Sequence, residues 1–515
     1  ALLEMNVDTA NLINNSNFVL NGHLDVDEAN VLINGQFELA STGKLSIDGG
    51  NFISNAPYSK DKAIQYLRGT LKLTDGLFEI QNNHIYLSNT FVDSVSGGTI
   101  KTGGSFVAGN PNSFQPTGGT VELSTKSGSC YIQCINGNYC HNLLINGLTT
   151  ISLYDSIHVQ NNFEIAQGAL DTDSYKMYVG GDWTNNAGDS GFLEETGIVV
   201  LNGTAEADIK TDEVFYDLEI DKNHASWEDL ELSNGIDVNV SNDLTIENGT
   251  LEMNTSSILD IDNDFVINPG GGLNAYGDTD LNIFVGGHWT NHNSYNNSWL
   301  GFYYGTSTVT FDGPNNQLIN SSCAADTFYN VVVDKPGTDF RPIQNTVIFG
   351  DVLISNGNWN DNGINLTHNF LGDFTVENGC GYLNSAHNTT VFTGVSDQNI
   401  IFNIDSTSGY FYNLVVDKSA VKTRRKNHEG EQASLNYLSD KKDRYQIVNL
   451  LTNCAALADG NTTIEEGTLK LNGNYYNSTG NIAVNDGGKL ELDANASLRI
   501  NNNKTIDINN GGELE

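Results

Sequence analysis

Three cysteines beside a histidine are the residues of this chain whose types and spacing most resemble a chemical site. Cys130, Cys134 and Cys140 follow one another as Cys-x3-Cys-x5-Cys, and His141 comes next. Thiolates and imidazoles at such spacing can hold a tetrahedral zinc ion. In an oxidising compartment the same thiols would form a disulfide within one turn of the fold or between neighbouring turns. The sequence favours a disulfide, with buried free thiols and a metal site as the alternatives.

Aspartates at every second position are the next candidates, as in Asp25-Val26-Asp27, Asp260-Ile261-Asp262 and Asp278-Thr279-Asp280. Alternate positions on a strand share one face, so their carboxylates would line up as oxygen ligands for Ca²⁺. The glycine-rich calcium-binding nonapeptide is absent. We therefore expect solvated strand faces and no cofactor, with weak surface calcium as the alternative.

Paired carboxylates are also the catalytic groups of glycosidases. The Asp-Asp and Gly-His-Gly clusters of pectin-cleaving enzymes, which share a β-helical scaffold, are absent from this sequence. His288 is replaced by Asp182 at the matching position of an internal repeat, which is not expected of a catalytic residue. The sequence predicts that the chain is not an enzyme.

Aromatic residues supply a candidate glycan surface. Planar rings beside polar side chains are how proteins hold sugar rings. The stretch from His292 to Tyr304 is longer and more polar than a tight turn. The candidate glycan contacts are Trp299, Tyr303, Tyr304 and Trp359. Trp183 and Trp289 are expected in the core instead.

Positive charge is concentrated between residues 418 and 444, which hold eight of the 24 basic residues. A charged insertion is usually a surface loop. Its functional interpretation is contact with an acidic partner, including another copy of this acidic chain. The candidate partner contacts are Arg424, Arg425, Lys426, Lys441 and Lys442.

The elements that would position these residues are repeated. Tyr178-Val179-Gly180-Gly181-Asp182-Trp183 returns as Phe284-Val285-Gly286-Gly287-His288-Trp289. A second phrase, Phe-Tyr-x-Leu/Val followed by Asp-Lys, begins at Phe215, Phe328 and Phe411. Such repetition is typical of a solenoid or a tandem array.

Short alternating runs separated by turn residues fill each large repeat. Leu490, Leu498, Ile506 and Leu514 recur at every eighth position, with asparagine and glycine between them. Alternation indicates strands with one buried face, in either a parallel β-helix or a series of β-sandwiches.

Spacing separates these two architectures. The glycines that end one strand before another begins are Gly168, Gly249, Gly357 and Gly467. Their steps have two sizes, and the sizes differ by about one β-helix coil. A solenoid can lose a coil, whereas a sandwich cannot lose a quarter of its strands. We therefore predict an all-β parallel β-helix, with tandem β-sandwich domains as the alternative.

The repeats also divide the chain. We expect N-terminal coils over residues 1–120, long-period repeats over 121–417, a basic insertion over 418–458 and C-terminal coils over 459–515. The last residues begin another repeat, so the chain is expected to be a segment of a larger protein.

Composition excludes several classes of function. The 515 residues include 63 acids and 24 bases, giving a net charge of −39, which would repel nucleic acid. No apolar run approaches the ~20 residues that span a bilayer, so no membrane-spanning segment is expected. An apolar content of 38% is enough to fill a narrow core.

Several phrases resemble the long secreted repeat proteins of Bacteroidetes and related bacteria. They are Gly98-Thr99-Ile100, Gly118-Gly119-Thr120-Val121, Leu244-Thr245-Ile246-Glu247-Asn248-Gly249, Val285-Gly286-Gly287-His288-Trp289 and Phe411-Tyr412-Asn413-Leu414. The resemblance covers residues 95–480 and carries over no catalytic residue. It implies an extracellular or cell-surface adhesin-like protein. We expect a structural or adhesive role as a rigid acidic rod, associated with itself or with surface glycans. A carbohydrate-binding or glycan-processing β-helix is the alternative.

Overall fold

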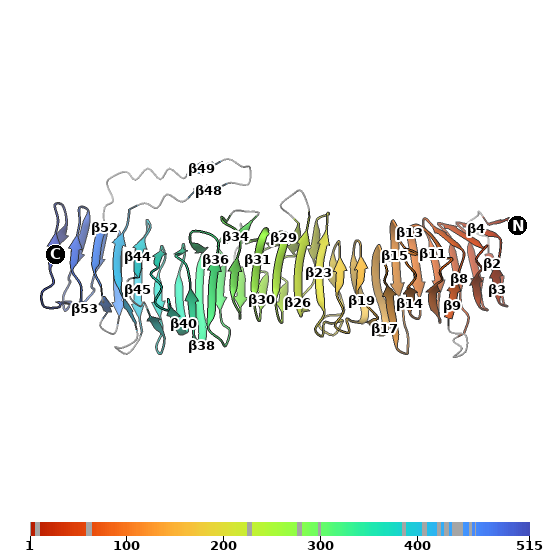
Figure 1. Ribbon diagram of the computed structural model, residues 1–515, viewed down its shortest axis with the longest axis horizontal. Helices are drawn as coiled ribbons and strands as arrows, with labels where there is room; N and C mark the ends of the chain where they lie inside the picture. Colours follow the sequence, from red (N-terminus) through yellow and green to blue (C-terminus); the bar gives the residue numbers. More distant parts are fainter. Residues whose placement is uncertain are drawn as a thin grey trace. The chain divides into compact units, whose positions relative to one another are not determined.

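The computed structural model is built entirely from β-strands in the residues that it describes. These are residues 2–5, 11–57, 64–223, 229–275, 281–296, 300–383, 388–403, 409–419, 424–426, 432–434, 446–452, 456–458 and 460–515. Parallel strands stack in a β-solenoid of about 20 turns, here called coils (Figure 1). The predicted parallel β-helix is confirmed, and the alternative of tandem β-sandwiches is wrong. No helix that could span a membrane is present in the described ranges.

Two compact units make up the chain, Ala1–Ser241 and Asn242–Glu515. Paired residues on successive coils are separated by 19 to 30 residues, as from Asn11 to Asn30 and from Trp289 to Ile319. Across the basic insertion the separation is 47 to 50 residues, as from Tyr410 to Leu457 and from Gln398 to Val448. The expected divisions after residues 120, 417 and 458 stay predictions.

In the first unit, strands of successive coils form three columns. One column runs through β11 (Leu77–Ile80), the second half of β13 (Val92–Thr102), β15 (Gly118–Leu123), the first half of β17 (Asn142–Leu153), the first half of β19 (Phe163–Asp171) and β21 (Trp183–Asn185). A second column runs through β9 (Ile64–Leu67), β12 (His84–Leu87), β14 (Phe106–Ala108), β16 (Cys130–Cys134) and the second half of β17. A third column includes β18 (Ile157–Val159), β20 (Met177–Val179), β23 (Ile198–Gly203) and β26 (Asp217–Lys222).

In the second unit, the long strands bend and serve two columns each. One column runs through β30 (Ile258–Ile261), β32 (Asn282–Val285), β35 (Thr308–Phe311) and the first halves of β38 (Asn330–Pro342) and β40 (Val352–Asn360). Another runs through β31 (Phe265–Asn274), β33 (Trp289–Asn291) and β36 (Gln317–Ser321) into the second half of β38.

The two repeated phrases meet inside the coils. Trp183 is fully buried, with its ring centroid 4.6 Å from that of Phe163 and 5.1 Å from that of Phe215. Trp289 is buried in the same way, 4.8 Å from Phe265 and 5.3 Å from Phe328. Aromatic pairs at these distances add about 0.5–1.5 kcal/mol beyond the burial of their surface. The prediction that both tryptophans lie in the core is confirmed.

The paired glycines of the first phrase are required by close stacking of coils. A Cβ atom on Gly180 would lie 2.2 Å from the carbonyl oxygen of Gln160, and one on Gly286 would lie 2.2 Å from that of Asp262. No side chain fits at these two corners.

Side chains of asparagine and aspartate join the coils of the first unit at one corner. Asn142 Oδ1 accepts a hydrogen bond from the backbone N–H of Asn162 at 3.1 Å. Asn162 Oδ1 accepts from Asp182 N, and Asp182 Oδ1 accepts from Asp208 N, both at 3.0 Å. We call this series the corner ladder. It explains the frequent asparagine, because a turn leaves backbone N–H groups that a short polar side chain can satisfy.

The second unit has the same corner ladder with one histidine in it. Asp243 Oδ1 accepts from Asp264 N at 3.1 Å, and Asp264 Oδ1 accepts from His288 N at 2.7 Å. His288 Nδ1 then accepts from Leu318 N at 3.0 Å. His288 therefore accepts a backbone N–H of the next coil as Asp182 does, and the expectation that neither is a catalytic residue stays a prediction.

Candidate functional site

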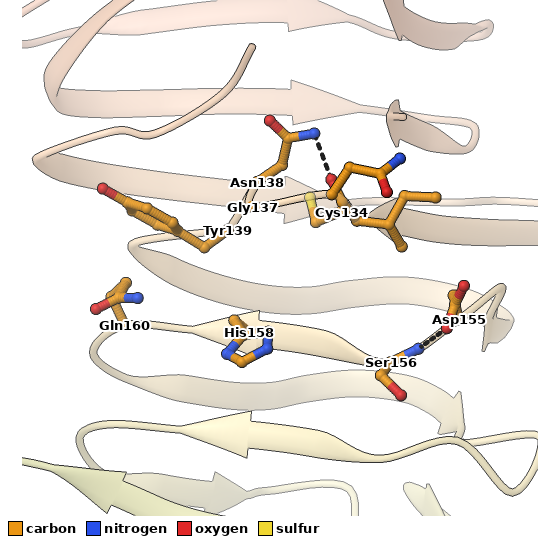
Figure 2. A pocket seen from close by; sticks show the side chains of 10 residues that line it. Cys134, Gly137, Asn138, Tyr139, Asp155, Ser156, His158 and Gln160 are labelled. Carbon is orange, nitrogen blue, oxygen red and sulfur yellow. Dashed lines mark hydrogen bonds between the residues drawn. The ribbon is translucent and has the colours of Figure 1, made fainter. Parts of the chain in front are cut away.

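A pocket of about 430 Å³ in the first unit brings together polar side chains of two neighbouring coils. One wall is the turn after β16, and the other is the segment that runs from the end of β17 past β18 (Figure 2). The lining residues are Cys134, Ile135, Asn136, Gly137, Asn138, Tyr139, Asp155, Ser156, His158 and Gln160.

The turn that forms the first wall is fixed by a buried asparagine. Asn136 and Gly137 have left-handed φ angles of 60° and 82°, which reverse the chain tightly. The Asn138 amide nitrogen donates to the carbonyl oxygens of Ala108 and Asn110, both at 2.7 Å. Its Oδ1 accepts from the N–H of Phe114 at 2.8 Å. These bonds tie the wall to the preceding coil.

The second wall carries His158, which points outward from β18. Its ring stacks on that of Tyr178 in the next coil, with centroids 4.2 Å apart and planes 5° apart. Partial burial lowers the pKa of His158 from its usual 6.5. A neutral imidazole offers one hydrogen-bond donor and one acceptor at neutral pH.

The pocket lining offers hydrogen-bonding groups from both walls. All ten lining residues are described, and no hydrogen bond joins the Ser156 hydroxyl to His158 or His158 to Asp155. Asp155 Oδ1 instead accepts the backbone N–H of Ser156 at 2.7 Å. Amides, hydroxyls and an imidazole around a small hollow can orient hydroxyl-rich molecules.

Of the three cysteines predicted to form a disulfide, only Cys134 lines this pocket. Cys134 Sγ and Cys140 Sγ are 3.7 Å apart and buried, whereas Cys130 lies at the other end of β16. All three are free thiols in the structure. Hydrogen bonding to Cys140 and burial raise the pKa of Cys134 well above its usual 9.0. A disulfide stays a prediction, with Cys134 and Cys140 as the pair that the fold brings together.

Metal ligation has no support in the described part of the chain, where no three His, Cys, Asp or Glu side chains are grouped to hold an ion. His141 is therefore not grouped with the three thiols as a zinc site. Asp278 and Asp280 lie outside the described residues.

Among the candidate glycan contacts, the prediction that Trp359 contacts a glycan is wrong. It is fully buried, because it takes an inward position of β40, and its ring packs 4.7 Å from that of Phe340. Tyr303 and Tyr304 are half-buried, and Tyr304 stacks on Phe349 at 5.2 Å, so their glycan contact stays a prediction. Trp299 lies outside the described residues.

The basic insertion contains the antiparallel pair formed by β48 (Arg424–Lys426) and β49 (Gln432–Ser434). Arg424, Arg425 and Lys426 make up β48, and their side chains are not described. Lys441 and Lys442 lie outside the described residues. Partner contact by these five residues stays a prediction.

The lysine at the end of each copy of the second repeated phrase is buried. We did not predict this burial from the sequence. Lys335 Nζ donates to Gly313 O at 2.7 Å and to Gln317 Oε1 at 2.9 Å. Lys418 makes the matching bond to Gln398 Oε1, so it belongs to the core and not to the basic insertion.

Lys222 is the third of these lysines. Its Nζ donates to Gly180 O at 2.9 Å and to Ala205 O at 3.1 Å. Burial lowers the pKa of each of the three lysines from 10.5 to about 8. Only the recurrence of this lysine in all three copies of the phrase could have indicated that it is buried. A single lysine at the end of a strand is normally exposed.

A buried carboxyl accompanies the first repeated tryptophan. Trp183 Nε1 donates to Glu213 Oε2 at 2.6 Å, and Asn185 Nδ2 donates to Glu213 Oε1 at 3.3 Å. Burial raises the pKa of Glu213 from 4.5 to about 7. This carboxyl is buried, and Trp183 and Asn185, which donate to it, do not line the pocket, so we assign it to the core.

Comparison of the chain with protein-family models, with curated proteins and with solved structures finds no match.

Proposed function

We propose that this chain is an extracellular repeat protein with a structural and adhesive role, and that it does not act as an enzyme. The observation that supports this proposal is the use of its recurrent polar residues. Asp182, Lys222 and His288 all hold neighbouring coils together through hydrogen bonds to the backbone. When every repeat keeps the hydrogen bonds that join neighbouring coils, each added repeat lengthens the same surface.

Association with further copies is part of the proposal. The net charge of −39 gives the coils an acidic surface, while seven of the 24 bases lie between residues 422 and 444, after the buried Lys418. Contact between the basic segment of one copy and the coils of another would bring opposite charges together and lower the repulsion within each copy. Such contacts weaken as salt is added, because exposed charges are screened within about 10 Å at 0.1 M salt.

Sedimentation velocity and electron microscopy of the purified chain test this association. We expect larger species at about 20 mM salt that dissociate at about 500 mM salt. The double variant Arg424→Glu/Arg425→Glu should remain monomeric. The matched control Arg499→Glu/Lys504→Glu makes the same charge change at two exposed positions and should still associate. Monomers of the parent chain at low salt and high concentration would contradict the proposal, and equal loss in the control would reduce it to a general charge effect.

Labelling of intact source cells with an antibody to the chain tests the extracellular location. We expect labelling without permeabilisation. Labelling only after lysis would overturn this part of the proposal.

A further inference from the structure

Four tyrosines form a strip on the outer face of the second column of the first unit. Parallel pairing places Tyr66 beside Tyr86, Tyr86 beside Val107, and Val107 beside Gln133 on successive coils. Tyr154 comes one residue after β17 and continues this row, since its N–H bonds to Ile132 O. Tyr131 occupies the adjacent outward position of β16. Across five coils the strip is ~19 Å long.

The four rings contact one another and reach solvent. The centroids of Tyr66 and Tyr86 are 5.9 Å apart, and those of Tyr131 and Tyr154 are 5.2 Å apart. The hydroxyls of Tyr86 and Tyr131 share a hydrogen bond that links the two pairs. Tyr66 is 42% exposed and Tyr154 is 56% exposed. Burial and the Tyr131 hydroxyl raise the pKa of Tyr86, and Tyr66 and Tyr154 add smaller effects, as expected of one cluster.

An ion pair borders the strip at Tyr66, and Asp155 follows Tyr154 at the other end. The Arg68 guanidinium lies 5.0 Å from the Tyr66 ring centroid and pairs with Glu38 at 2.6 Å. Gln133 and Ser152 provide polar groups between the rings, since both point outward from their strands. The apolar faces with flanking hydrogen-bonding groups match the two sides of a sugar ring.

The strip adjoins the pocket. Gln133 directly precedes Cys134, and Tyr154 directly precedes Asp155, and both of these following residues line the pocket. A chain lying along the tyrosines would therefore reach Ser156 and His158 at its end.

We propose that the tyrosine strip and this pocket form a binding site for a linear, uncharged polysaccharide. Successive sugar rings stack on the tyrosines, and one sugar at the end or on a branch is held by hydrogen bonds in the pocket. A polyanionic glycan is disfavoured by the net charge of −39. The site goes beyond the proposed structural role and does not depend on self-association.

Titration calorimetry of the full chain with three neutral hexasaccharides, cellohexaose, xylohexaose and mannohexaose, tests the proposal. We expect at least one to bind, with weaker binding of its disaccharide and no binding of an oligogalacturonate. The variant Tyr66→Ala/Tyr154→Ala should bind about tenfold more weakly, because two stacking contacts are lost. His158→Ala should weaken the binding of the hexasaccharide several-fold.

A matched control removes two tyrosines of similar exposure from the second unit. Tyr295 is 56% exposed and Tyr475 is 36% exposed, and Tyr295→Ala/Tyr475→Ala should bind as the parent does. Saturation by none of the three hexasaccharides, or equal affinity of the strip variant and the parent, would overturn the proposal. Equal loss in the control variant would also overturn it. Measuring at about 500 mM salt, where copies should be separate, keeps the outcome distinct from that of self-association.

Discussion

At the scale of single residues, the interior holds ionisable groups without an opposite charge in direct contact. Lys335 is fully buried, yet its hydrogen bonds go to a carbonyl and an amide, and Asp312 acts on it only at a distance. Such groups bind protons differently in the folded and unfolded chain, so stability must depend on pH.

The Lys335→Met variant should reveal this dependence. The folded pKa of about 8 lies below the ordinary 10.5, so the unfolded chain alone keeps the proton between these values. The lysine's contribution to the free energy of unfolding therefore rises with pH across that window. Relative to Lys335→Met, the parent should gain about 1 kcal/mol between about pH 7 and about pH 9.5, after allowance for solvent screening. Urea denaturation measures both chains, and the exposed Lys72→Met should show no such change. A difference in the free energy of unfolding between the parent and Lys335→Met that stays constant with pH would refute the lowered pKa of Lys335.

The Glu213→Gln variant should reveal a pH dependence of stability with the opposite sign. The folded pKa of about 7 lies above the ordinary 4.5, so the carboxyl's contribution to stability is present below pH 4.5 and declines up to about pH 7. Glutamine keeps an acceptor for Trp183 Nε1 without a charge. Glu213→Gln should therefore be more stable than the parent by about 2 kcal/mol at about pH 8.5, and the gap should close near about pH 4.5. A gap that favours the parent at high pH would mean that the Trp183 and Asn185 donors stabilise the carboxylate as an ion.

At the scale of elements, the coil was predictable and the register was not. Alternating residues such as those around Leu490 and Leu498 define short strands, and the spacing of Gly168, Gly249 and Gly357 selects a solenoid. Trp359 was misplaced because its face depends on where β38 and β40 align, which no local pattern specifies. The tyrosine strip was missed for the same reason, since its members are unevenly spaced along the chain and meet only through pairing.

The corner ladder predicts which substitutions the coils tolerate. In His288→Ala the N–H of Leu318 loses its acceptor, and stability should fall by about 1 kcal/mol. His288→Asn restores a short acceptor of the kind found at Asn162, and should recover most of the loss. Urea midpoints of the three chains give the comparison. Equal midpoints for the alanine and asparagine variants would show that water replaces the ladder bond.

At the scale of the whole molecule, the strands of each coil pair only with those of its neighbours, so a full coil should be removable. Deleting residues 163–182 of the first unit joins Asn162 to Trp183 and removes β19 and β20. β17 can then pair with β21 and with β22 (Phe192–Leu193), and β18 with β23, in their existing registers. We expect a folded protein with a cooperative transition and slightly lower stability.

Deleting residues 163–172 alone is the matched comparison. It removes part of a coil, shifts the remaining columns out of register and should prevent folding. Circular dichroism and urea titration distinguish the two. Failure of the full-coil deletion, or folding of the partial one, would contradict nearest-neighbour stability.

The corner ladder also bears on how such a chain changes over generations. Because Asn142, Asn162 and Asp182 make the same joint, a duplicated or lost coil meets its new neighbour through a bond that is already present. Unequal recombination within the gene would then alter the number of coils without requiring compensating mutations. Length becomes a property that selection can adjust in steps of one coil.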